Sequence, residues 1–249
     1  MENIWRKEWK GNIFFSHGRS HSRGVLLPVR DNLDFQLRSI KVDSQGRYVF
    51  LEVSIQESPY FLLNIYAPNK CSEQCTFFKE ISEILKAARA EQDYSIIVGG
   101  DFNVILDPDL DGRGGNNRKK DSAKLFEDMH LYFDLVDIWR IRNPTTPLFT
   151  WRQKIPVVRR RLDFWLINDS LQDEIISAEI ETVKVKPVKE DQNYKRWKNV
   201  ILIQIVEISR NWSVFKQNMI NCTITLHKGQ SFALGQPGMK WVRKTTNIF

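Results

Sequence analysis

Three short segments of the chain place polar side chains at the ends of apolar stretches. They are residues 64–68 (Asn-Ile-Tyr-Ala-Pro), residues 99–103 (Gly-Gly-Asp-Phe-Asn) and residues 161–164 (Arg-Leu-Asp-Phe). Side chains at the ends of strands can be held rigidly above the edge of a sheet, which a functional site requires. We therefore expect any chemistry of this chain to lie at these three segments.

The segment Gly-Gly-Asp-Phe-Asn has a direct chemical interpretation. An apolar strand over residues 95–98 runs into two glycines that permit close backbone approach, and Asp101 and Asn103 can then share one face of the extended chain. A carboxylate can act as a base or bind a metal, an amide can bond to a phosphate oxygen, and Mg²⁺ can neutralise charge. These are the needs of phosphodiester hydrolysis, although a strand-to-turn junction is the better explanation of the segment when it is taken alone.

Hydrophobic patterning predicts the elements that would position these segments. Strict alternation over residues 47–55, followed after Ser58-Pro59 by residues 60–66, predicts a β-hairpin. Helical periodicity predicts helices over residues 72–91 and 122–133. Further strands are expected over residues 24–29, 95–98, 149–151 and 161–167. Strands mixed with helical crossovers indicate an α/β fold of two packed β-sheets flanked by helices.

Charge is unevenly distributed along the chain. The net charge is +7, and residues 184–249 hold 12 Lys and Arg against three acidic residues, which leaves residues 1–183 with −2. We therefore expect a partial α/β domain over residues 1–183 and a basic C-terminal extension over residues 184–249 that is helical or irregular. The basic extension suits contact with a polyanion, but an ordinary solvated surface explains it nearly as well.

Several classes of protein are excluded by composition. No run of about 18 apolar residues is present, so we expect no membrane span. The first seven residues lack the apolar core of a signal peptide, and three cysteines supply no disulfide framework and no disulfide-linked partner. An intracellular protein is the expectation. Cys71 and Cys75 lie one helical turn apart, but no second pair exists to complete a metal site.

The order of these motifs resembles a known superfamily. Asn-Ile-Tyr-Ala-Pro, Gly-Gly-Asp-Phe-Asn, then Phe-Thr-Trp and Arg-Leu-Asp-Phe are similar to the endonuclease/exonuclease/phosphatase superfamily, which includes apurinic endonucleases, pancreatic DNase and inositol phosphatases. Residues 14–18, 22–25, 106–108 and 150–153 look like the endonuclease domains of LINE-type (non-LTR) retrotransposons. The resemblance runs from about residue 4 to about residue 181.

This resemblance implies a role for each matching residue. Tyr66 matches the tyrosine that contacts the scissile phosphate, Asp101 the carboxylate that orients or deprotonates the attacking water, and Asn103 the amide that holds the phosphate and metal region. Thr150 matches a DNA-contacting position, and Asp163 a structural, DNA-proximal aspartate. The resemblance also implies a DNase I-like sandwich, Mg²⁺ as cofactor, DNA as partner and a nuclear location.

Two further arginines are candidates for DNA contact. Arg118 lies in the Gly- and Lys-rich stretch 112–120, which we expect at the rim of the site, and Arg160 lies within Arg-Arg-Arg at residues 159–161. A solvated strand edge explains Arg160 equally well. Residues 107–112 begin like a calcium-binding loop, but Arg118 occupies the position where a glutamate is needed, so calcium binding is not expected.

The chain departs from the superfamily at both ends of the pattern. Relatives carry an early Gln-Glu-Thr, whose glutamate is the principal Mg²⁺ ligand, and a final Ser-Asp-His, whose histidine stabilises the phosphate. Neither motif occurs here, and none of the four histidines follows an aspartate. We assign no metal ligand, expect weakened Mg²⁺ binding, and expect an incomplete, impaired endonuclease, because losing one electrostatic stabiliser typically costs about 10²–10³ in rate.

Two alternatives remain open at this point. The first is a non-catalytic remnant that binds nucleic acid, which the missing motifs favour. The second is a phosphatase of the same superfamily acting on inositol lipids or another small phosphoester, which the Phe-Thr-Trp-Arg-Gln context at residues 149–153 disfavours. The oligomeric state and the target sequence are open.

Overall fold

The computed structural model describes residues 6, 9–18, 24–31, 33–91, 94–115, 121–175, 178–183, 200–205 and 220–224. The strands are β1 (Gly11–His17), β2 (Gly24–Arg30), β3 (Phe35–Val42), β4 (Tyr48–Ile55), β5 (Ser58–Tyr66), β6 (Ser95–Asp101), β7 (Gly112–Arg113), β8 (Leu135–Asp137), β9 (Trp151–Gln153), β10 (Val158–Arg160), β11 (Asp163–Asn168), β12 (Ala178–Val183), β13 (Val200–Ile205) and β14 (Ile220–Ile224). The helices are α2 (Cys71–Glu91), α3 (Asp121–Tyr132), α4 (Ile138–Arg142) and a 3₁₀ turn at Asp169–Leu171.

A six-stranded sheet in the order β3-β4-β5-β6-β11-β8 forms the centre of the fold. The predicted hairpin is present as β4 and β5, which pair antiparallel through a tight turn at Gln56 and Glu57, both with positive φ. β5 and β6 pair in parallel, and α2 supplies the long crossover that such a pair needs. The other neighbouring pairs of this sheet are antiparallel.

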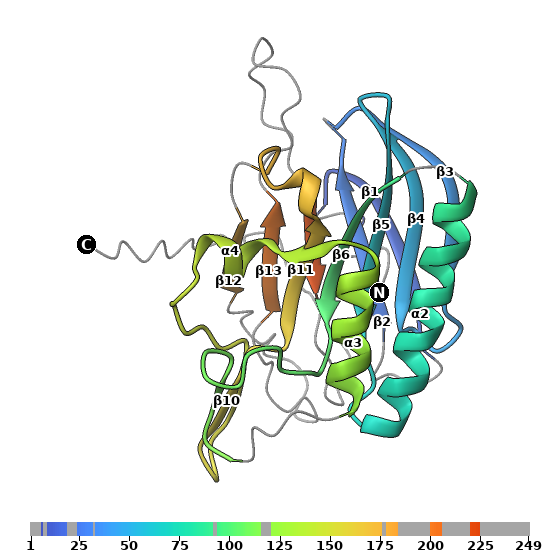
Figure 1. Ribbon diagram of the computed structural model, residues 1–249. Helices are drawn as coiled ribbons and strands as arrows, with labels where there is room; N and C mark the ends of the chain where they lie inside the picture. Colours follow the sequence, from blue (N-terminus) through green and yellow to red (C-terminus); the bar gives the residue numbers. More distant parts are fainter. Residues whose placement is uncertain are drawn as a thin grey trace, which may run out of the picture.

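A second layer of strands packs on one face of the central sheet (Figure 1). It consists of the hairpin β1–β2 and the three-stranded sheet β12-β13-β14, with β14 lying close to β2. Leu27 and Val29 of β2 pack with Leu51 and Val53 of β4 in the apolar core between the layers. The predicted α/β fold of two packed β-sheets flanked by helices is therefore confirmed.

The helices α2 and α3 cover the opposite face of the central sheet (Figure 1). Phe78 of α2 and Phe126 of α3 stack on each other with ring centroids 5.1 Å apart, and both belong to the core that includes Phe61 and Phe164. The two predicted helices are confirmed, each beginning one residue earlier than expected. Among the described residues, none of the helices combines the length and the apolar character needed to cross a membrane.

Two described segments within residues 184–249 differ from the expectation of a helical or irregular extension. Residues 200–205 and 220–224 are strands that pair antiparallel, and β13 also pairs with β12. A strand is favoured over a helix at β13 because Val200, Ile201, Ile203 and Ile205 have β-branched side chains. The rest of this region lies outside the described residues, and the boundary at residue 183 stays a prediction.

Gly100 offers a test of the parallel pairing between β5 and β6. Its φ is +144°, and a Cβ there would lie 2.1 Å from the carbonyl oxygen of Ile65. We expect Gly100→Ala to lower the free energy of unfolding by at least about 2 kcal/mol, because it adds both backbone strain and a clash that backbone must relieve. Gly24→Ala is the matched control, since its Cβ would meet the oxygen of Ser16 only at 3.4 Å. Equal urea midpoints for the two variants would contradict this pairing.

Candidate functional site

The strand register brings three of the candidate residues into one row. Tyr66 pairs with Asp101 across β5 and β6, and Asp101 pairs with Asp163 across β6 and β11. Partners in register point to the same side of a sheet, and Tyr66 belongs to the core between the two strand layers. The three side chains therefore extend from neighbouring strands toward the second layer, at the same end of the central sheet.

Asn103 lies just beyond this row and ties it together. Its φ is +52°, in the left-handed region that asparagine tolerates. Its backbone N–H donates to Oδ1 of Asp101 at 2.9 Å, and its side-chain Nδ2 donates to the carbonyl oxygen of Ala67 at 2.7 Å. The backbone N–H of Ala67 in turn donates to the carbonyl oxygen of Asp101 at 2.8 Å. The ends of β5 and β6 are therefore cross-linked, and the Asp101 carboxylate has a fixed orientation.

Gln74 is a buried residue that the sequence analysis did not identify. It lies in the first turn of α2, and its Nε2 donates to the carbonyl oxygens of Pro68 at 2.8 Å and Asn103 at 2.9 Å. Its Oε1 accepts from the hydroxyl of Ser122 on α3 at 2.7 Å. A fully buried amide with all these partners holds both strand-end loops against the helices. The signal available in the sequence was a polar residue on the apolar face of a helix.

Arg47 brings positive charge beside Tyr66. Its guanidinium carbon lies 5.6 Å from the centroid of the Tyr66 ring, and Nη1 donates to the Tyr66 carbonyl oxygen at 3.4 Å. The backbone N–H of Tyr66 donates to the Arg47 carbonyl oxygen at 2.7 Å. Both side chains are nearly buried. The ring of Tyr66 therefore has a fixed position, and a cation–π contact contributes to it.

Asp163 is the most buried member of the row, with 0% of its surface exposed. Within the described part of the chain, neither of its side-chain oxygens has a hydrogen-bond partner at bonding distance. Burial raises the pKa of Asp163 to about 7, while the Thr150 hydroxyl and the positive charge of Arg161 oppose that rise. Asp163 is therefore a carboxyl group that is partly protonated at neutral pH.

Thr150 is positioned by backbone groups on both sides. Its Oγ1 accepts from the N–H of Leu162 at 3.0 Å, and its own N–H donates to the carbonyl oxygen of Arg160 at 2.9 Å. These bonds hold Thr150 next to the Leu162–Asp163 segment. Thr150 thus joins the row structurally, and its contact with DNA stays a prediction.

Arg160 points into the protein rather than along a strand edge. Its guanidinium donates to three carbonyl oxygens, those of Arg113 at 3.0 Å, Arg159 at 2.7 Å and Gly114 at 2.8 Å. The residue is 8% exposed, and burial lowers its pKa. This placement favours a structural role over the DNA contact that the sequence suggested. Arg118, the other arginine assigned to DNA, lies outside the described residues.

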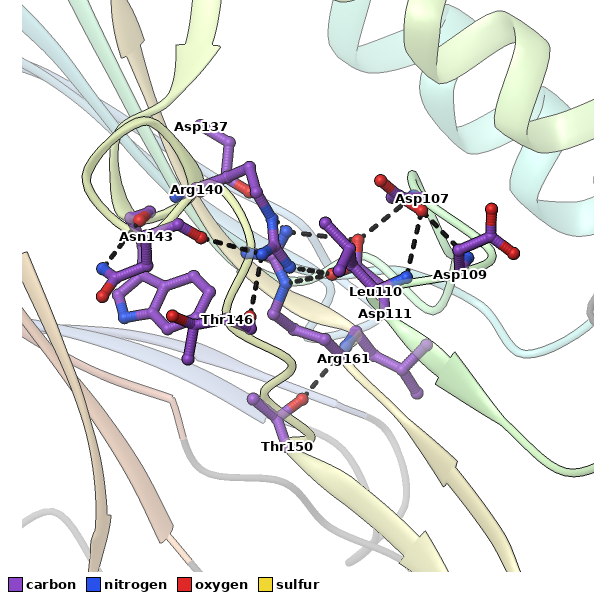
Figure 2. A network of polar contacts seen from close by, with 12 residues as sticks. Asp107, Asp109, Leu110, Asp111, Asp137, Arg140, Asn143, Thr146, Thr150 and Arg161 are labelled. Atoms are coloured by element: carbon purple, nitrogen blue, oxygen red, sulfur yellow. Dashed lines mark hydrogen bonds and ion pairs between the residues drawn. The ribbon is translucent and has the colours of Figure 1, made fainter. Parts of the chain in front are cut away.

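A network of ion pairs, centred on the buried side chains of Asp111 and Arg161, lies beside Thr150 (Figure 2). Asp111 is fully buried, and its carboxylate pairs with Nε of Arg161 at 2.7 Å and Nη2 of Arg140 at 2.5 Å. Nη2 of Arg161 also pairs with Asp137 at 2.6 Å. Two arginines and two aspartates therefore neutralise one another. Buried charges need this kind of mutual pairing, because removing them from water is costly.

Arg161 is the central member of the network. Burial alone would lower the pKa of Arg161, but Asp137 and Asp111 raise it above its usual value. Its guanidinium lies 4.5 Å from the ring centroid of Phe164 and 5.2 Å from that of Trp139. Its backbone N–H donates to the Asp111 carbonyl oxygen at 2.8 Å. The backbone that leads into Asp163 is thereby fixed.

The loop that resembles the start of a calcium site has a structural role instead. Oδ1 of Asp107 accepts from the N–H groups of Asp109 at 2.9 Å and Leu110 at 3.0 Å, which closes the turn. Oδ2 of Asp111 accepts from the N–H of Asp107 at 3.1 Å. Asp107 therefore stabilises the turn, and Asp111 stabilises both the turn and the ion pairs.

The fit of this site to a metal ion is incomplete. Among the described residues, no group of three or more His, Cys, Asp and Glu side chains could hold a metal. The row offers two carboxylates, Asp101 and Asp163, and the second is fully buried with a raised pKa. Mg²⁺ requires near-octahedral oxygen ligation. The described side chains therefore do not make a metal site by themselves.

Comparison with known proteins finds a relative in sequence and several solved structures with a similar fold. No protein-family model matches the chain. Over 189 residues, 75% of the chain, the sequence is 31% identical to the Transposon TX1 uncharacterized 149 kDa protein of Xenopus laevis. The chain spans only 14% of the length of that protein.

Solved structures share the fold. An AP endonuclease, LMAP from Leishmania major, is 17% identical with a TM-score of 0.52, covering 61% of this chain and 57% of that one. The 3′-5′ exonuclease NExo from Neisseria meningitidis is 14% identical with a TM-score of 0.51, covering 68% and 72%. The 3′ phosphatase NExo from Neisseria, in a structure bound to a product DNA hairpin, is 14% identical with a TM-score of 0.50, covering 72% of this chain and 74% of that one. Likeness at this identity establishes the fold alone.

The raised pKa of Asp163 predicts a pH-dependent stability. The folded chain holds this proton up to about pH 7, whereas the ordinary carboxyl pKa is 3.8, so this group lowers the free energy of unfolding as the pH rises between those values. We expect Asp163→Asn, which cannot ionise, to gain stability relative to wild type across that window, by on the order of 1 kcal/mol or more. Thermal midpoints of both proteins measured from about pH 4 to pH 8 would show the difference.

His130 provides an internal check on that measurement. Burial lowers the pKa of His130 to about 4, so protonation destabilises the fold as the pH falls from the ordinary value of 6.5. This loss occurs in both proteins and cancels in their difference. A difference that does not change with pH would show that Asp163 ionises like an exposed carboxyl.

Asp111→Ala tests the buried network. It leaves Arg161 and Arg140 without their shared carboxylate, so we expect the free energy of unfolding to fall by about 3–5 kcal/mol. Asp109→Ala, a change of the same type at an exposed residue of the same turn, is the control and should change it by less than about 0.5 kcal/mol. Urea unfolding measures both, and similar losses would show that the network contributes no more than the turn.

Proposed function

We propose that this chain, which has the fold of apurinic endonucleases and 3′-5′ exonucleases and is related in sequence to a transposon protein, is an endonuclease-type domain that hydrolyses phosphodiester bonds in DNA. The observation that carries the proposal is the register that aligns Tyr66, Asp101 and Asp163 at one end of the central sheet. It joins three motifs that lie far apart in the chain. A nuclear location follows if chromosomal DNA is the substrate.

Asp101 is the group we assign to the attacking water. Its carboxylate accepts from the Asn103 N–H, which fixes its orientation, and only 4% of its surface is exposed. A carboxylate so held can orient a water molecule and accept its proton. The water oxygen then bonds to phosphorus, the bond to the departing sugar oxygen breaks, and that oxygen takes a proton from solvent. Fixed geometry supports this role, since a near-attack arrangement lowers the barrier.

Tyr66 and Asn103 are the groups we assign to the phosphate. The Tyr66 ring is held beside the positive charge of Arg47, which would favour an anion nearby. The Asn103 amide has its Nδ2 directed to the Ala67 carbonyl oxygen, so its position relative to Asp101 is constrained. Asp163 and Thr150 support the third strand of the row, and their contact with DNA is part of the proposal.

Slow turnover is the second part of the proposal. Mg²⁺, when bound, supplies neutralisation of the phosphate charge. The described side chains make no site for it by themselves, and the 249 residues contain neither Gln-Glu-Thr nor Ser-Asp-His. We therefore expect weak Mg²⁺ affinity and a rate below that of an intact homologue by at least about 10²–10³.

A non-catalytic nucleic-acid-binding protein is the second candidate. The net charge of +7 and a cluster of exposed arginines on β7, β9 and β10 favour it. Salt-dependent DNA binding without any cleavage would identify this function. Hydrolysis of small phosphoesters in the absence of DNA cleavage would point to a phosphatase instead.

Nicking of supercoiled plasmid tests the proposed function. We expect slow, Mg²⁺-dependent nicking that EDTA abolishes, and a further loss of about 10² or more in Asp101→Asn and of about 10-fold in Tyr66→Phe. Asp109→Asn, at an exposed carboxylate outside the row, is the control and should nick like wild type. Nicking that survives unchanged in Asp101→Asn would exclude this site as its source. Turnover equal to that of an intact homologue would overturn the proposed impairment.

A further inference from the structure

Three arginines form a row across the small sheet β7-β10-β9. Arg113 pairs with Arg159, and Arg159 pairs with Arg152, so the three occupy one face of neighbouring strands. All three are exposed, whereas Arg160, the next residue along β10, is directed into the protein. The sheet extends away from the packed layers and from the helices (Figure 1). The row is therefore a projecting strip of positive charge.

This arrangement is unfavourable for the protein by itself. Residues opposite each other on antiparallel strands have Cα atoms about 4.5–5.5 Å apart, so three guanidinium groups extend from within roughly 10 Å of backbone. Like charges in such positions destabilise a sheet. In the part of the chain that the structure describes, no carboxylate pairs with any of the three, and residues 150–161 contain no Asp or Glu. A polyanionic ligand would relieve the repulsion.

The base of this sheet is joined to the candidate site. The N–H of Thr150 donates to the Arg160 carbonyl oxygen, and the N–H of Leu162 donates to Thr150 Oγ1. Arg160 also bonds to the carbonyl oxygens of Arg113 and Gly114, which ties β7 to β10. The orientation of the strip relative to the Asp101–Asp163 pair is thereby fixed.

We propose that Arg113, Arg152 and Arg159 form a phosphate-binding strip that holds the backbone of duplex DNA beside the candidate site. The inference rests on the proposed function and names the surface that engages its substrate. Arginine suits this task because its planar guanidinium donates two parallel hydrogen bonds to a phosphate. Contacts to phosphates carry no sequence information, so a phosphate-binding strip acts on affinity and not on sequence preference.

Salt dependence of DNA binding tests the strip. The full chain in EDTA is titrated with a labelled duplex by fluorescence anisotropy, at several salt concentrations. If each arginine neutralises one phosphate, the triple variant Arg113→Gln, Arg152→Gln, Arg159→Gln should reduce the slope of log K against log salt by roughly 2.7. The loss should be the same for duplexes of unrelated sequence.

A control with the same change in net charge separates local contact from general electrostatics. Lys79→Gln, Arg89→Gln and Lys124→Gln alter three exposed residues of α2 and α3, on the helix layer. This triple variant should keep the wild-type slope. Equal slopes of log K against log salt for wild type and the arginine variant would overturn the proposed strip. Equal reductions of this slope in both triple variants would overturn it as well.

Two further readouts keep the outcome interpretable. Removing the like charges should leave the thermal midpoint of the arginine variant equal to or above that of wild type at low salt, so misfolding is detected independently. Because EDTA prevents turnover, binding is measured whether or not the chain cleaves DNA. A chain that binds through the strip without nicking contradicts the proposed function alone. One that nicks with unchanged salt slope in the variant contradicts the strip alone.

Discussion

Parallel pairing of β5 with β6 brings Tyr66 beside Asp101, and the remaining geometry of the site depends on that pairing. The two strands approach closely because Gly100 has no Cβ to meet the Ile65 carbonyl oxygen. Beyond the last paired residues, the bonds of Ala67 and Asn103 continue the connection between the strand ends. A slip of one residue would turn Asp101 to the helix side of the sheet. The chemistry assigned to Asp101 is therefore a consequence of register.

Two groups of described arginines near the candidate site have different environments, and each environment indicates a different role. Arg161 and Arg140 are paired with Asp111 and Asp137 in a network that is neutral in sum, so they contribute rigidity next to Asp163. The exposed row of Arg113, Arg159 and Arg152 has no such compensation among the described residues. The arginines paired with aspartates therefore support the site, whereas the exposed arginines of the small sheet are the ones that we assign to anion binding.

The candidate site contains side chains held in fixed positions, and the described residues include no group of three or more possible metal ligands. Asp101 and Asn103 are held by backbone bonds, and Gln74 fixes the loops on which they depend. Asp163, the other carboxyl of the row, is buried, and burial raises its pKa to about 7.

Local sequence determined the elements and their buried faces. Alternation in residues 47–55 and helical periodicity in residues 72–91 were sufficient to predict the β4–β5 hairpin and α2, because the repeat of each element is local. The order of the motifs also indicated that Tyr66 and Asp101 would lie together.

Tertiary structure alone decided which charges are neutralised: Arg161 pairs with Asp111, 50 residues away, and Arg160 turns inward while Arg159 faces solvent. It also decided that residues 200–205 and 220–224 join a sheet. Such outcomes depend on which distant surfaces meet and exclude water, and no local repeat encodes that.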